Sequence, residues 1–120
     1  MREKKLTSDE IQDGLRHFTG TVDYHRYYTL FLTDGVIWLA EHAECFWLIS
    51  VIWSIQPRLA EHEYMVTCTL TVRENYSAVF TATGDGDVEL YRQEIPITDF
   101  PLPSIKLYYA DNVVMLPYEY

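Results

Sequence analysis

The chain has 120 residues, of which 48% are hydrophobic and 15% aromatic, and its formal net charge is −9. This length fits residues 1–120 as a single domain with its own core, and the apolar content excludes a disordered chain. A field of this sign repels phosphate backbones, so direct nucleic-acid binding is not expected.

The N-terminus is charged, and acidic residues follow where a signal peptide would carry its apolar segment. We therefore expect a cytoplasmic protein. Residues 7–10, Thr-Ser-Asp-Glu, have the spacing of a capping box, in which Thr7 caps the Glu10 amide and Glu10 reaches back. A short helix is predicted to follow, with Ile11, Leu15 and Phe18 on one face.

The most apolar stretch of the chain covers residues 35–55. Ionisable side chains at positions 41, 42 and 44 would each cost about 3 kcal/mol at the centre of a bilayer, which excludes a membrane span. Thr33 or Asp34 can cap a helix here, and Pro57 ends it because proline disfavours helical geometry in the residue before it. The pattern predicts one long buried central helix.

Beyond residue 64 the hydrophobic period falls to two, which is typical of strands. The sequence Gly-Asp-Gly-Asp at 84–87 and the Asp111-Asn112 pair mark hairpin turns. Residues 24–28 are interpreted as irregular or short extended structure. The predicted fold is an α+β domain, in which the two helices pack on a four- to five-stranded antiparallel sheet. The predicted strands are 65–72, 78–83, 88–95, 105–109 and 113–116.

Motifs for catalysis, metal binding or nucleotide binding are not recognisable in the sequence. His42 and Cys45 have a spacing that would suit two ligands on one helix, but no paired motif supplies the others. Cys45 and Cys68 both fall in apolar runs and are expected to be reduced core thiols. We therefore expect no enzyme activity and no cofactor or metal, with a small enzyme or metal-binding protein kept as a minor hypothesis.

Two groups of side chains are candidates for binding a partner protein. Residues 27–120 carry the whole net charge, and acids around the predicted hairpin suit a basic surface. Ten tyrosines in this length either complete the core, with their hydroxyls at its rim, or form a recognition patch. The candidate partner-binding residues are Asp85, Asp87, Glu89, Glu94, Asp99, Tyr24, Tyr27 and Tyr28.

Several segments in a specific order resemble a family of small uncharacterised proteins (a domain of unknown function) from phages, plasmids and other bacterial mobile elements. The chain departs from the family pattern at Ala43-Glu44-Cys45-Phe46, where Ala-Gly-Ala-Tyr is expected, and at Ser50, where Asp is expected. The resemblance implies a mobile-element context and supplies no catalytic residues. The similar segments are 15–28, 33–36, 39–41, 47–48, Gln56, 98–102, 105–108 and 116–120.

Charge and resemblance together favour a non-enzymatic inhibitor that binds a host protein. Its target would be a basic surface that normally holds nucleic acid, as in an anti-phage nuclease complex, and the effect would be anti-CRISPR-like occlusion. The alternative is a self-associating structural or accessory protein of a mobile element, which would form a homodimer and have no host target.

Overall fold

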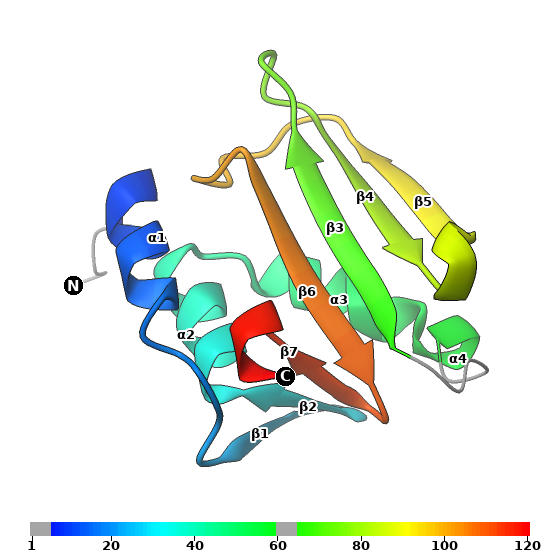
Figure 1. Ribbon diagram of the computed structural model, residues 1–120. Helices are drawn as coiled ribbons and strands as arrows, with labels where there is room; N and C mark the ends of the chain where they lie inside the picture. The colour runs from blue at the N-terminus through cyan, green and yellow to red at the C-terminus, as the bar shows by residue number, and fades with distance from the viewer. Residues whose placement is uncertain (1–5, 60–64) are drawn as a thin grey trace.

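The computed structural model describes residues 6–59 and 65–120, so the charged N-terminal residues 1–5 lie outside the described part. A seven-stranded sheet is covered on one face by helices (Figure 1). The mixed α+β class is as predicted. The helices are α1 (Ser8–Leu15), α2 (Asp34–His42), α3 (Phe46–Ser54) and α4 (Gln56–Leu59). The strands are β1 (Tyr24–Tyr27), β2 (Leu30–Thr33), β3 (Val66–Val72), β4 (Ala78–Thr83), β5 (Glu89–Ile95), β6 (Ser104–Ala110) and β7 (Val113–Met115).

The strand order is β1-β2-β7-β6-β3-β4-β5, which places β1 and β5 at the two edges. The prediction of four to five strands was wrong, because β1 and β2 were not recognised as strands. The prediction of a wholly antiparallel sheet was also wrong, since β2 and β7 pair in parallel, with Phe31 opposite Val113. Both missed strands are only four residues long, too short for their alternation to stand out in an aromatic segment.

The prediction of one long central helix was also wrong, because the apolar stretch forms two helices, α2 and α3. The Ala43 N–H bonds to the Leu39 carbonyl, and the Cys45 N–H bonds back to the Ala40 carbonyl at 3.0 Å. Glu44 between them has φ +52°. The Cys45-to-Ala40 bond across a left-handed residue is the Schellman pattern that terminates helices. The chain therefore turns at Glu44, and α3 sets out in a new direction.

The first helix begins as predicted. Thr7 Oγ1 accepts the Glu10 N–H, and Glu10 Oε1 accepts the Thr7 N–H, which completes the capping box. Ile11 and Leu15 are buried against the core. Gly14 lets α1 approach α2 closely, because a Cβ at this position would lie 2.1 Å from the Trp38 ring.

The core lies between the helices and one face of the sheet. In β3 the even-numbered residues from 66 to 70 are buried, as are Ala78, Phe80 and Ala82 in β4. Both cysteines are buried and neither forms a disulfide, and burial raises the pKa of Cys68 to about 12. In the described part of the chain, no helix is long and apolar enough to cross a membrane.

Candidate partner-binding surface

The sequence-predicted partner residues lie at opposite edges of the sheet. Tyr24, Tyr27 and Tyr28 belong to β1 and the turn after it, whereas the acids lie on and around β5. Six strand spacings separate these edges, which corresponds to about 29 Å along the sheet. The structure therefore brings the tyrosines together and the acids together, but it does not join the two groups into one patch.

Two of the five predicted acids are paired with arginines. Glu89 lies 2.8 Å from the Arg92 guanidinium, and Glu94 lies 2.9 Å from that of Arg73. The hydrogen bond from Arg73 lowers the pKa of Glu94. These contacts reduce the negative field that the β5 edge presents.

The other three acids lie in turns and loops. Asp85 and Asp87 are exposed in a short 3₁₀ turn between β4 and β5, where Gly86 and Asp87 both have positive φ. Asp99 is exposed in the loop that follows β5 and lines a shallow hollow with Trp47. The strongest negative feature of this edge is therefore the Asp85–Asp87 turn.

The β1–β2 turn carries a cluster of aromatic rings. The Tyr28 ring packs against Trp53 at 4.9 Å between centroids and against Tyr27 at 5.0 Å. Tyr27 in turn stacks on Phe46 at 6.1 Å. Tyr28 is 65% exposed, Trp53 39% and Phe46 37%, so the cluster faces solvent.

Hydrogen bonds hold this turn in place. Trp53 Nε1 donates to Thr29 Oγ1 at 3.0 Å, and Gln56 Nε2 donates to the Thr29 carbonyl at 3.1 Å. The Gln56 side chain also bonds to Asn112 Oδ1, which ties the turn to the β6–β7 hairpin. Tyr28 itself has φ +55°, a costly conformation for a tyrosine, which persists because its surroundings determine it.

The other face of β1 and β2 adds two more exposed rings. Tyr24 and Phe31 line an apolar hollow with Val113, and the Arg26 guanidinium lies 6.0 Å from the centre of the Phe31 ring. We call the combined surface the aromatic edge, because it flanks the free side of β1 on both faces. Five of the eight exposed aromatic side chains in the described residues belong to it. The aromatic edge consists of Tyr24, Tyr27, Tyr28, Phe31, Phe46 and Trp53.

Sequence reasoning missed three members of the aromatic edge. Phe46 and Trp53 were assigned to one long buried helix, although their i, i+7 spacing places them on one face of α3. That spacing was a usable signal. Phe31 was missed because β2 was not recognised, so the side of the sheet to which it points was unknown.

Near the start of β1 and α2, a group of polar side chains is joined by hydrogen bonds. Asp34 Oδ2 accepts the Val22 N–H at 2.9 Å, and Asp34 Oδ1 lies 2.8 Å from His25 Nε2. The Val22 hydrogen bond, followed by His25, lowers the pKa of Asp34. The arrangement positions β1 against α2. Ser50, on α3, bonds to the Tyr27 hydroxyl.

Although His42 and Cys45 are only three residues apart, their side chains lie in different environments. His42 stacks on the Trp38 ring at 4.5 Å, and its Nδ1 lies 2.9 Å from the Trp38 carbonyl. Cys45 is fully buried in the core. Residues 6–59 and 65–120 contain no group of three His, Cys, Asp or Glu side chains placed to hold a metal ion.

Comparison with known proteins identifies a family to which the chain is similar. Residues 9–120 match a family described as a family of unknown function, DUF6876. No curated protein and no solved structure matches the chain. Because the match covers almost the whole length, the chain belongs to this family.

Proposed function

We propose that this protein is a non-enzymatic binding protein of a phage or other mobile element, which inhibits a host defence protein by covering a basic, nucleic-acid-binding surface. The aromatic edge is the observation that supports this proposal. Exposed tyrosine and tryptophan side chains, concentrated on one surface, are typical of protein–protein interfaces. Five exposed rings gather around one short edge strand, and contiguous exposed apolar patches mark interaction sites.

The β1–β2 turn is held rigidly by its contacts, which favours tight binding. Tyr28 and Trp53 are already held by ring packing and by the Thr29 hydrogen bonds, so little side-chain entropy remains to be lost on association. The net charge of −9 would speed encounter with a basic partner over about one Debye length. In this arrangement the rings supply affinity, and the acids of the β5 edge act mainly through the long-range field.

Affinity capture from nuclease-treated lysate of a bacterial host, followed by mass spectrometry, tests the proposal. A single stoichiometric partner with a basic surface is expected. Y28A and W53A should each lower its affinity by about 2 kcal/mol, roughly 30-fold, as for interface hot spots.

The matched control is Y76A, which removes another exposed tyrosine with positive φ from the distant β3–β4 turn. Its affinity should equal that of the wild type. Equal losses in Y76A and Y28A would contradict a role for the aromatic edge. Charge reversal in D85K/D87K should slow association and leave dissociation unchanged, because these residues lie at the far edge of the sheet.

Self-association is the alternative, and the free side of β1 favours it. An unpaired edge strand flanked by aromatic rings can pair with the same strand of a second copy. Light scattering over a range of concentrations separates the two proposals. A dimer that Y28A dissociates, with no host protein recovered in the capture experiment, would replace the inhibitor proposal.

A further inference from the structure

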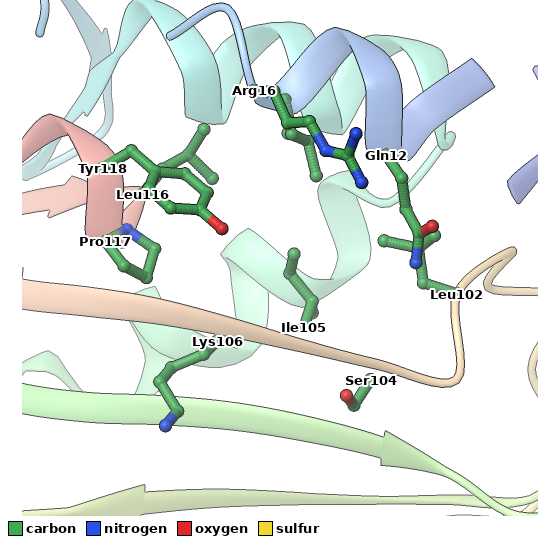
Figure 2. Close-up of a pocket in the computed structure, with 10 residues that line it drawn as sticks. Gln12, Arg16, Leu102, Ser104, Ile105, Lys106, Leu116, Pro117 and Tyr118 are labelled. Atoms are coloured by element: carbon green, nitrogen blue, oxygen red, sulfur yellow. The ribbon is translucent and has the colours of Figure 1, made fainter. Parts of the chain in front are cut away.

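A hollow of about 380 Å³ lies beside β6, between α1 and the C-terminal 3₁₀ turn Pro117–Glu119. Figure 2 shows the side chains of Gln12, Arg16 and Tyr118 around the space next to Ile105. Leu15, Leu102, Ile105, Leu116 and Pro117 supply apolar walls. Its volume falls within the range of ligand-binding clefts.

The charge of this hollow is opposite to that of the molecule. Its ten lining residues include no acid, although the chain has 18 acids and nine bases. Arg16 lies on the same side of β6 as Ile105, whereas the Lys106 side chain leaves β6 on the outer face of the sheet (Figure 2). In the described part of the chain, the one ion pair of Arg16 is a long, exposed contact of 3.9 Å with Asp13. Within the described residues, Lys106 makes no salt bridge. The hollow is therefore suited to a group with negative charge.

Among residues 6–59 and 65–120, the wall formed by β6 also offers backbone groups without a hydrogen-bond partner. The Val72 N–H donates to the Pro103 carbonyl at 2.8 Å across the β3–β6 boundary. Backbone groups of alternate residues in an antiparallel strand point to opposite neighbours. Ile105 therefore faces β3, whereas the N–H and C=O groups of Ser104 and Lys106 face the hollow.

The neighbour that would have paired with these groups ends early. β7 pairs with β6 only as far as Met115, opposite Tyr108. Beyond it Pro117 has no N–H to donate, and the chain turns into the 3₁₀ turn. Among the described strands, β6 thus has an open side from Ser104 to Leu107, next to the hollow.

We propose that this hollow binds an extended acidic peptide segment of a partner, which adds a short strand to the open side of β6. Its backbone bonds to Ser104 and Lys106, and its apolar side chains cover Ile105. Because side chains alternate across a strand, its carboxylates meet Lys106 on the outer face of the sheet or Arg16 on the inner one. Peptide recognition by strand addition takes affinity from the backbone and specificity from side-chain pockets. This site lies on a different surface from the aromatic edge and does not depend on it.

Nuclear magnetic resonance titration tests the proposal with three blocked pentapeptides, Glu-Val-Glu-Val-Glu and its Gln-Val and Lys-Val counterparts. The acidic peptide should shift the amide signals of Ser104 and Lys106 and slow their hydrogen exchange. It should bind more tightly than the Gln peptide, and the Lys peptide most weakly. Equal affinities, or shifts only elsewhere, would overturn the proposal.

Substitutions separate the backbone contact from the charge. K106P removes the N–H that faces the hollow and leaves the bonds to β3, while K106A removes the charge and keeps the N–H. The acidic peptide should bind K106P about tenfold more weakly than K106A, the equivalent of one hydrogen bond. If K106P fails to fold, N-methylation of the peptide backbone applies the same test to the wild-type protein. Unchanged binding of the methylated peptides would refute strand addition.

Discussion

Glu119 joins the C-terminal turn to the start of α2 through three hydrogen bonds. Its Oε1 accepts the Thr33 hydroxyl at 2.5 Å and the Leu116 N–H at 3.1 Å, and its Oε2 accepts the Gly35 N–H at 3.0 Å. The Gly35 amide belongs to the first turn of α2, where no intrahelical partner exists. One side chain therefore replaces the missing cap of α2 and fixes the last turn of the chain.

Removal of this carboxylate in E119A should lower the free energy of unfolding by about 2 kcal/mol, because three donors lose a charged acceptor. E119Q should lose less, since its amide oxygen still accepts. The measurement is urea denaturation followed by circular dichroism. E74A, which truncates an exposed acid in the β3–β4 turn, is the control and should change stability by less than about 0.5 kcal/mol. A similar loss in both variants would contradict the assignment.

The Asp34 carboxyl makes the free energy of unfolding depend on pH in the acidic range. The Val22 N–H and His25 hold the pKa of its carboxyl below the ordinary value of 3.8. A lowered folded-state pKa contributes stability that is present above the unfolded-state value and lost as the pH falls through the folded-state value. The difference in unfolding free energy between wild type and D34N should therefore shrink as the pH is lowered from about 5 to about 2.5.

Carboxyl carbon chemical shifts followed by nuclear magnetic resonance would report the Asp34 titration directly. A midpoint at or above 3.8 would contradict the hydrogen-bonding role of this side chain. A constant difference between wild type and D34N across the same pH window would do so as well.

The boundary between α2 and α3 depends on the backbone conformation of one residue, Glu44. Glu44 has φ +52°, which costs a side-chain-bearing residue energy that glycine does not pay. Neither hydrophobicity nor charge marks this position, so the apolar stretch was predicted as one helix. The family resemblance carried the missing signal, because it places glycine at position 44, where a left-handed helix end requires it.

E44G should be more stable than E44A by about 1 kcal/mol. Comparison with E44A rather than with the wild type cancels whatever the Glu44 side chain contributes through its own contacts. Thermal unfolding of the two variants at equal concentration measures the difference. Equal stability would mean that the left-handed turn is not retained in solution.

Sheet elements were predictable where strands were long and alternating. β3, β4 and β5 follow the two-residue period, and the Asp111-Asn112 turn joins β6 to β7, with both residues at positive φ. β1 and β2 pair with each other as a local hairpin but are too short to show a clear pattern, and the place of β2 in the sheet depends on β7 at the other end of the chain. The pairing of β2 with β7 sets the face to which Phe31 points, so Phe31 could not be predicted as an exposed ring, whereas the i, i+7 spacing of Phe46 and Trp53 was a signal present in the sequence.

At the scale of the whole molecule, the fold separates the two kinds of predicted partner residue. The Tyr24–Tyr27 strand and the Asp85–Asp87 turn are about 60 residues apart in the sequence. A separation of this length does not determine whether the two segments lie near each other in the fold. The sheet order places them at opposite edges. Composition alone therefore supplied candidate residue types for the proposed interface, while the topology decides which of them a single partner could touch.

The alkylation rates of the two buried thiols, Cys45 and Cys68, measure how often the core opens. Cys45 and Cys68 are 0% and 2% exposed, and burial raises the pKa of Cys68 to about 12, so neither should react with iodoacetamide in the folded state. Alkylation should then proceed through unfolding, and its rate should track the population of the open form. Because 2 kcal/mol corresponds to about 30-fold, E119A should speed the labelling of both cysteines by about that factor. Mass spectrometry of the two cysteine peptides measures each rate. Acceleration of Cys45 alone would mean that the helical layer opens without the sheet, and that Glu119 stabilises only that layer.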